Sequence, residues 1–318
     1  MVQGMSKISV IGAGSVGATI ANDLMIQGTA SEIVLVDINK QKAFGEAMDI
    51  YQGAPFCSPA IVRSGDYAAT AGSDIVVITS GMPRKAGQSR LDLAQANVNI
   101  IKDIAPQVVK AAPNAKYVIV SNPVDVLTYV FHKVSGLPEN QIIGSGTILD
   151  TSRLQSELAK IFRISPKNVH AHVYGEHGDS SFVPWSLVHI ANNHVDVYKE
   201  SSPDKDRIDW HQQYAEIEEF VRTSGGQVIK AKGATFYAVS VSVCHICKCV
   251  LGGIDTTMTV STMMHGEYGI DDICLSTLNM VGNHGLRGKV NVPLTDGEIA
   301  KLRASADTLK DVINNLEI

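Results

Sequence analysis

A glycine-rich turn near the start of the chain limits the folds that this sequence can adopt. Residues 12–17 (GAGSVG) follow the β-rich run 7–11 and open a stretch of helical character that continues to Leu24. A second apolar run, residues 33–36, ends at Asp37, twenty residues after the last glycine of the turn. Strand, glycine turn, helix and strand within about thirty residues form the dinucleotide-binding unit of parallel α/β sheets.

The residues of this unit have separate roles. Glycines permit a tight turn and let the main chain approach a pyrophosphate, which rests at the positive N-terminal end of the helix. Asp37 is placed to bind ribose hydroxyls and to repel a 2′-phosphate, which favours NAD over NADP. A small-residue turn without a ligand is the alternative for the motif alone. The residues expected to contact the cofactor here are Gly12, Gly14, Ser15, Val16, Gly17 and Asp37.

Strand-like and helical segments alternate through the first half of the chain. The expected strands are residues 7–11, 33–36, 75–78, 117–120 and 142–144, and the expected crossover helices are residues 91–112 and 124–134. This alternation predicts a parallel sheet with helices on both faces. After about residue 150, a helix over residues 152–162 precedes apolar strands and longer helices. We expect an α/β fold, with a doubly wound Rossmann sheet over residues 1–145 and an α+β substrate and catalytic domain over residues 146–318.

The composition excludes several classes of protein. The chain has 318 residues, of which 45% are hydrophobic and 19% charged, as in ordinary globular proteins. Its net charge of -5 and the lack of a basic stripe argue against a nucleic-acid partner. Residues 1–7 lack the apolar core of a signal peptide, and polar residues and glycines interrupt residues 8–26. We therefore expect a cytoplasmic protein without a membrane partner.

The cysteines offer an alternative site. Cys244, Cys247 and Cys249 surround His245, an arrangement that could bind a metal. They lie in the apolar stretch 234–251, where cysteine behaves as a small hydrophobic residue. A zinc site would need a fourth ligand, and the sequence has no second CxxC motif. The odd count of five cysteines favours reduced thiols, and we expect no metal.

The end of the chain carries a helix signal. Thr295 and Glu298 have the spacing of a capping box. The apolar positions that follow keep the 3.6-residue period of an amphipathic helix: Ile299, Leu302, Ala306, Leu309, Ile313 and Leu316. We expect a structural helix here.

Two arginines follow the third expected strand. Arg84 and Arg90 lie six positions apart in residues 81–90, directly after the apolar run 75–78. Guanidinium groups bind carboxylates through paired hydrogen bonds, and a glycine-bounded loop can close over a ligand. Two solvated surface arginines are the alternative for this stretch taken alone. With the cofactor unit beside it, the loop indicates a small anionic substrate.

Four further polar residues complete a candidate site. Asn122 follows the fourth expected strand, where open sheets place ligand contacts. Asp150 and Arg153, three apart, can point from one helix into one cleft. His177 lies in the glycine-bounded turn 175–179 (GEHGD). Alone, Asp150 and Arg153 would indicate a surface ion pair and His177 a structural histidine. Together with the glycine turn and the two-arginine loop, they indicate an enzyme.

These segments resemble the lactate/malate dehydrogenase family over essentially the whole chain. The matching motifs are residues 12–17, 84–90, 121–125, 150–153 and 175–179. The resemblance implies reduction of a 2-oxo acid with NADH. It implies that His177 donates the proton, Asp150 fixes its tautomer, Arg153 grips the substrate carboxylate and Arg90 polarises the carbonyl. It also implies substrate contacts for Arg84, Asn122 and Thr235, and cofactor contacts for Thr79, Gly81, Asn97, Val120 and Asn122.

The motifs disagree on which oxo acid is the substrate. Residues 144–147, 175–179, 184–186 and 232–235 resemble the lactate branch, and imply pyruvate and L-lactate as substrates. Arg84 stands where malate enzymes carry arginine and lactate enzymes carry an uncharged residue. A guanidinium would pair with the second carboxylate of oxaloacetate, whereas pyruvate would leave it unpaired at about 3 to 5 kcal/mol if fully buried. We therefore expect Arg84 to confer oxaloacetate/L-malate activity, with pyruvate weakened rather than lost.

Several alternatives and partners stay open at this point. They are a dedicated L-malate dehydrogenase, a non-catalytic NAD-sensing protein, and a metal-assisted NAD enzyme acting on sugars. His170 and His172 lie near His177 in sequence, but a metal-bound His177 could not donate a proton. The resemblance implies a homo-oligomer, dimer or tetramer. It further implies that a histidine and an arginine would bind fructose 1,6-bisphosphate as an activator. His170 is present but Gln155 replaces the expected arginine, so we do not expect strong activation.

Overall fold

A single sheet runs through both halves of the protein. The computed structural model describes residues 6–82, 89–203, 205–207 and 209–318. Within them, nine strands pair in the order β12-β11-β10-β6-β5-β4-β1-β2-β3. Strands β1 to β6 are parallel, and β10 to β12 continue the sheet antiparallel. Their bounds are β1 (Lys7–Ile11), β2 (Glu32–Val36), β3 (Ile61–Gly65), β4 (Ile75–Ile78), β5 (Lys116–Ile119), β6 (Ile142–Gly144), β10 (Thr256–His265), β11 (Asp271–Gly282) and β12 (Gly285–Lys289).

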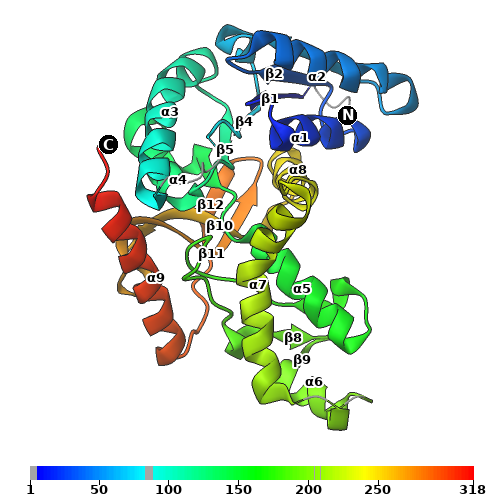
Figure 1. Cartoon of the computed structure of the whole chain (residues 1–318), viewed down its shortest axis with the longest axis vertical. Helices are drawn as coiled ribbons and strands as arrows, with labels where there is room; N and C mark the ends of the chain where they lie inside the picture. Colours follow the sequence, from blue (N-terminus) through cyan, green and yellow to red (C-terminus); the bar gives the residue numbers. More distant parts are fainter. Residues whose placement is uncertain (1–5, 83–88, 204, 208) are drawn as a thin grey trace.

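Neighbouring residues of the parallel strands face opposite helix layers, as the two-residue period of a strand requires. Val10 packs in the cluster that includes α1 (Ser15–Ile26), α2 (Lys40–Gln52) and α8 (Tyr237–Leu251). Ile11 packs in the cluster that includes α3 (Arg90–Ala111) and α4 (Val124–Ser135). Figure 1 shows the parallel strands between these layers. Burial on both faces explains why the strands are almost continuously apolar.

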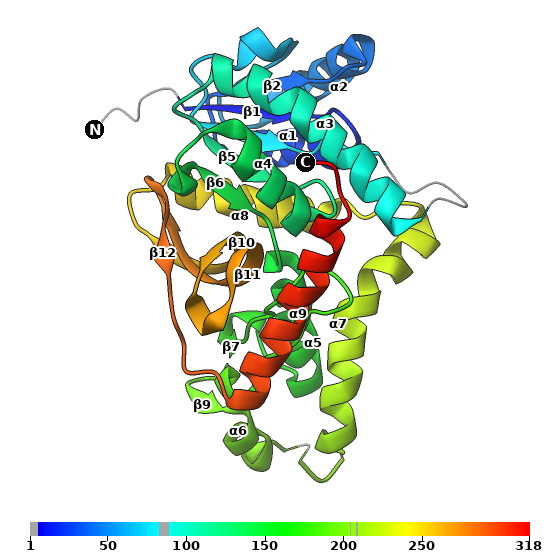
Figure 2. The same ribbon diagram turned by 90° about the vertical axis from the view of Figure 1, so that its left-hand side faces the viewer.

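The second half adds a body below the parallel sheet in Figure 1. It contains α5 (Ile148–Phe162), α6 (Val195–Ser201), α7 (Trp210–Lys232) and a small sheet of β7 (Val169–His170), β8 (His189–Ile190) and β9 (Asn193–His194). Leu154, Phe162 and Trp210 belong to its core. Helix α9 (Asp296–Asn314) extends alongside β10 and β11 in Figure 2 and packs into the α3–α4 cluster.

The structure confirms the predicted fold class and differs in detail. Strand β3 was not predicted, because its half-exposed sequence IVRSG at the sheet edge lacks an apolar run. Helix α5 begins at Ile148, four residues before the predicted start. The capping box of Thr295 and Glu298 is formed in both directions, as predicted. Among the described residues, none of the helices has the length and apolar character that a membrane crossing requires.

Candidate functional site

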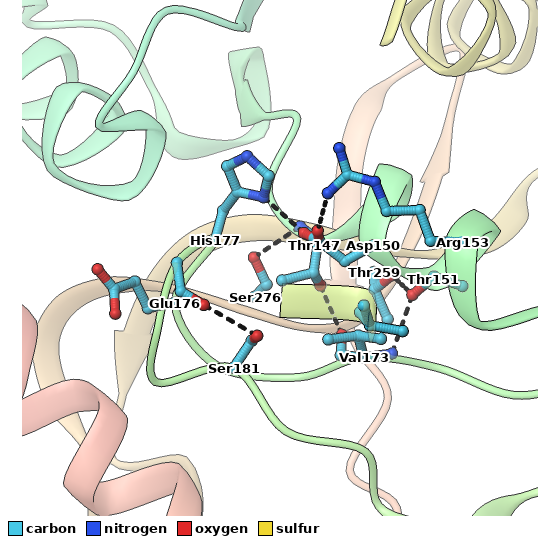
Figure 3. A network of polar contacts seen from close by, with 12 residues as sticks. Thr147, Asp150, Thr151, Arg153, Val173, Glu176, His177, Ser181, Thr259 and Ser276 are labelled. Carbon is cyan, nitrogen blue, oxygen red and sulfur yellow. Dashed lines mark hydrogen bonds and ion pairs between the residues drawn. The ribbon is translucent and has the colours of Figure 1, made fainter. Parts of the chain in front are cut away.

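The fold brings together three of the predicted site residues. Nδ1 of His177 lies 2.5 Å from Oδ2 of Asp150, and the Arg153 guanidinium donates to Oδ1 of the same carboxylate at 2.7 Å (Figure 3). The Asp150 side chain is 7% exposed, and that of His177 is 23% exposed. Because an ionised carboxylate only accepts hydrogen bonds, Nδ1 must carry the proton in this contact. The second ring nitrogen of His177 points away from Asp150 in Figure 3.

The start of α5 positions Asp150 and Arg153. Both face the same side because they are three residues apart on a helix, with Asp150 in the first turn, where the helix dipole favours an anion. Thr147, the residue directly before α5, is fully buried, and its N–H donates to Oγ of Ser276 on β11 at 3.1 Å. Gly146 has a positive φ of 51°, and a side chain there would overlap Ser276 and β10. The helix therefore begins at a fixed point on the sheet.

The charges of the site favour an ion pair of His177 and Asp150. Burial opposes ionisation of Asp150, but the charge and hydrogen bond of His177, followed by those of Arg153, outweigh it and lower the pKa of Asp150. Burial likewise disfavours the imidazolium. The charge and hydrogen bond of Asp150, followed by the charge of Asp125, still raise the pKa of His177, while Arg153 acts in the opposite direction. The protonated form of His177 is thus retained to higher pH than in an ordinary histidine.

The turn that carries His177 is held from three sides. The N–H of Gly175 donates to the carbonyl of Ser276 at 3.0 Å. The next N–H, of Glu176, donates to Oγ of Ser305 on α9 at 2.8 Å. The N–H of His177 itself donates to Oδ2 of Asp125 on α4 at 2.7 Å. The imidazole therefore projects from a main chain that leaves little freedom.

The glycine turn lacks side chains at Gly12, Gly14 and Gly17. Gly12 has a φ of 107°, and a methyl group at Gly17 would overlap the carbonyl of Gly12, so both positions require glycine. A Cβ at Gly14 would meet nothing within 4 Å, which leaves the turn open on that side. Thr79 donates to the carbonyls of Ile11 and Gly12 and locks the turn to the end of β4. These residues fit a bound pyrophosphate at the start of α1.

Asp37 is bound to the same turn. Its Oδ2 accepts the N–H of Ala13 at 2.7 Å, and its Oδ1 accepts the N–H of Asn39 at 2.8 Å. A carboxylate has about four acceptor positions, so ribose hydroxyls can still bind. Ser15 opens α1 at the exposed side of the turn, and Val16 packs against the core.

A second group of predicted residues meets at the ends of β4 and β5. Buried Asn97 accepts the N–H of Met82 at 2.7 Å and donates to the carbonyl of Asn122 at 2.8 Å. Gly81 lies against Asn97, since a Cβ there would come within 3.5 Å of its side-chain oxygen. Val120 continues β5, and its N–H donates to the carbonyl of Ile78. Asn97 thus ties together the two loops at the carboxyl ends of these strands.

Other predicted residues lie elsewhere or outside the described part. Arg84 is outside the described residues, and Arg90 is described only as the first residue of α3. Thr235 lies half-buried between α7 and α8. Cys244 and Cys247 are fully buried in α8, as expected for structural cysteines. Among the described residues, no three His, Cys, Asp or Glu side chains are arranged to hold a metal ion.

Sequence reasoning assigned no role to Asp125, Ser276 or Ser305. Asp125 was part of the motif over residues 121–125, and a charge at an apolar helix start was a usable signal. No local pattern marked the two serines, whose roles come from long-range contacts with the turns before Asp150 and His177.

Comparison with known proteins agrees with this geometry. Residues 6–144 match the NAD binding domain of lactate/malate dehydrogenase, and residues 147–317 match the alpha/beta C-terminal domain of the same family. The chain belongs to the lactate/malate dehydrogenase family. Because the first match is the family's NAD binding domain, the cofactor of this dehydrogenase-family chain is NAD.

Individual family members match over nearly the full length. An L-lactate dehydrogenase of Clostridium botulinum (strain Hall) is 48% identical, over 98% of this chain and 96% of its own. The crystal structure of a lactate dehydrogenase from a Medee basin deep-sea metagenome library has a TM-score of 0.94 at 34% identity, covering 98% of both chains. The minor L-lactate dehydrogenase of Enterococcus mundtii in the ligands-bound form also gives 0.94, at 33% identity and 99% coverage of both chains.

Proposed function

We propose that this protein is an NAD-dependent L-2-hydroxyacid dehydrogenase that interconverts pyruvate and L-lactate. The observation that carries the proposal is the contact of His177 with Asp150 at 2.5 Å, beside Arg153 on α5. A proton donor and a carboxylate-binding group thus lie together in a chain whose N-terminal part binds NAD. The L-lactate dehydrogenases among its relatives support the choice of substrate.

Each residue has a defined part in the reaction. Bound NADH supplies the hydride that reduces the carbonyl carbon. His177 as imidazolium gives a proton to the carbonyl oxygen, and Asp150 stabilises this cation and keeps its tautomer. Arg153 orients the substrate through its carboxylate, and its tie to Asp150 holds it near the histidine. Arg90 has the proposed role of polarising the carbonyl, and Asn122 and Thr235 that of contacting the substrate.

Arg84 adds a second candidate substrate. Its charge would pair with the additional carboxylate of oxaloacetate, which supports L-malate dehydrogenase activity on a lactate-type framework. Steady-state kcat/KM for NADH oxidation with pyruvate and with oxaloacetate tests both parts. Turnover of both supports the proposal, and turnover of oxaloacetate alone would indicate a dedicated L-malate dehydrogenase. Absence of turnover with either would favour a non-catalytic NAD sensor.

The proposal extends to organisation and location. The cofactor part spans residues 1–145 and the substrate part residues 146–318, meeting between β6 and α5. Exposed Phe44, Met48 and Tyr51 on α2 support assembly into a homo-oligomer, which the resemblance also implies. Five free cysteines support a reducing, cytoplasmic compartment.

Asp37→Asn is expected to reduce discrimination between the two nicotinamide cofactors. The amide keeps an acceptor for the N–H of Ala13 but loses the charge that repels a 2′-phosphate. We expect the ratio of kcat/KM for NADH over NADPH to fall by about 10- to 100-fold. Kinetics with each cofactor measure this ratio, and Asp66→Asn, at another turn of the same half, is the matched control. An unchanged ratio would show that Asp37 does not select the cofactor.

Fructose 1,6-bisphosphate is expected to change activity by less than about twofold at subsaturating pyruvate. Gln155 carries no charge, and its amide donates to the carbonyl of Ala171 at 3.1 Å, so it cannot replace an arginine against a phosphate. His170 is exposed and would act alone. Titration of the sugar bisphosphate against initial rate measures the effect, and activation of tenfold or more would contradict it.

A further inference from the structure

Asp125 is a buried carboxylate that the reaction as described does not use. It lies in the first turn of α4 and is 2% exposed. Its neighbours Val124, Val126 and Leu127 are buried and apolar. A carboxylate in such surroundings is costly unless its hydrogen bonds and nearby charges compensate. Packing alone therefore does not explain why a carboxylate stands at this position.

The contact with the catalytic turn supplies a geometric reason. Oδ2 of Asp125 accepts the main-chain N–H of His177 at 2.7 Å, across 52 positions of sequence. The preceding N–H, of Glu176, is bound at 2.8 Å by the neutral hydroxyl of Ser305. Two consecutive amides of the turn thus donate to side chains of two helices, α9 and α4. Of these two acceptors, Ser305 is neutral and only Asp125 can carry a charge. A hydroxyl or amide oxygen would suffice to hold the chain, so the charge has another effect.

The surroundings of Asp125 leave that charge incompletely compensated. Burial raises the pKa of Asp125 to about 6, although Ser261 and the N–H and charge of His177 favour the ionised form and Glu176 opposes it. Oδ1 of Asp125 and Oγ of Ser261 have no hydrogen-bond partner of normal geometry among the described residues. The thiol of Cys274 on β11 also lies within its electrostatic reach. At neutral pH the carboxylate is mostly ionised, and the charge of His177 favours this ionised form.

We propose that Asp125 is a positioning residue for His177: it fixes the main chain of the catalytic turn and adds a second buried anion that stabilises the imidazolium. The inference rests on the proposed function, in which His177 donates the proton. Asp150 holds one ring nitrogen, and Arg153, also on α5, opposes the histidine's charge. Asp125 offsets that opposition from a different helix.

Two substitutions separate the hydrogen bond from the charge. Asp125→Asn keeps an acceptor for the N–H of His177 and removes the charge, whereas Asp125→Ala removes both. Ser305→Ala removes the neutral acceptor from the same turn. Asp272→Asn is the matched control, because this exposed carboxylate pairs with Lys133 of α4 and lies outside the site.

The expected results differ between a charge effect and a structural effect. For Asp125→Asn, kcat/KM for pyruvate at pH 7.5 falls about 10-fold, and the basic limb of its pH profile moves down by about one unit. Asp125→Ala loses about 100-fold with the same shift. Ser305→Ala slows turnover but leaves the basic limb of the pH profile at its wild-type position. Asp272→Asn has the activity and the pH profile of the wild type.

Thermal unfolding provides a second measurement, in which Asp125→Asn is expected to raise stability although it lowers activity. A carboxyl group whose pKa is raised on folding from 3.8 to about 6 contributes stability below the lower value and loses it as pH rises through the upper one. Asp125→Asn is therefore expected to melt higher than the wild type at pH 7.5, with the difference vanishing near pH 4. A lower melting temperature with an unmoved basic limb would reduce Asp125 to a structural residue and overturn the proposal.

A titration without turnover keeps this inference distinct from the proposed function. Nuclear magnetic resonance of histidine-labelled protein, with His177→Gln to assign the signal, gives the pKa of His177 directly. A lower pKa in Asp125→Asn than in the wild type supports the inference even if neither oxo acid is turned over. An equal pKa in both proteins overturns it, whatever the activity.

Discussion

His177→Gln is expected to lower kcat for pyruvate reduction by about 10²- to 10⁴-fold, because the carbonyl oxygen loses its proton donor. The neutral amide can still accept or donate a hydrogen bond but does not titrate. The wild type should lose activity as pH rises through a histidine pKa above the ordinary value of 6.5, since Asp150 stabilises the charged ring against burial. The variant should show no such limb. Stopped-flow measurement of NADH consumption from pH 5 to 10 gives both results.

The control for this prediction is cofactor binding. The hydrogen bonds of His177 run to Asp125 and Asp150 and not to the cofactor-binding glycine turn, so fluorescence titration should give the same NADH affinity for variant and wild type. A variant that retains a tenth or more of the wild-type kcat would remove His177 from the role of proton donor. Unchanged NADH affinity would show that a low kcat of the variant comes from loss of the proton donor and not from loss of folding.

Arg84→Gln is expected to shift substrate preference towards pyruvate by about 10- to 100-fold in the ratio of kcat/KM values. The substitution removes the charge that would pair with the second carboxylate of oxaloacetate. It also removes the charge that pyruvate would leave unpaired, so the two values should move in opposite directions. This expected shift is smaller than the cost of about 3 to 5 kcal/mol for a fully buried unpaired charge, because a long arginine side chain can stay in water.

The pattern of the two kcat/KM values tests the role of Arg84. A fall for oxaloacetate with a rise for pyruvate is the expected outcome. Arg84→Lys is the matched variant: it keeps the charge but loses the two-point fork, so it should retain part of the oxaloacetate preference. An unchanged ratio in Arg84→Gln would show that other residues select the substrate.

Local chemistry explains which features the sequence could predict. The glycine turn, Asp37 and the capping box of α9 each depend on contacts within one motif or between neighbouring elements, and their spacing is visible in the chain. Asp150 and Arg153 follow from helical geometry, which brings positions three apart to one face. The apolar strands are visible because burial on both faces requires an apolar sequence.

Contacts between distant segments were beyond such reasoning. The meeting of Asp125 with His177 depends on how α4, the sheet and the turn pack, and no spacing rule relates positions 52 apart. Strand β3 escaped because an edge strand with one open side needs no continuous apolar run. The sheet's continuation from β6 into β10 likewise depends on a pairing of Gly144 with Ser261.

That pairing has a mechanical consequence. Main-chain pairing and close packing at Gly144, where a side chain would overlap Thr128 and Ser261, join the NAD binding domain to the alpha/beta C-terminal domain. A hinge at this pairing would have to break main-chain hydrogen bonds between buried residues, which opposes movement of the two parts at this point. The glycine turn after β1 and the turn that carries His177 are both attached to this one sheet, so its backbone sets the spacing between them.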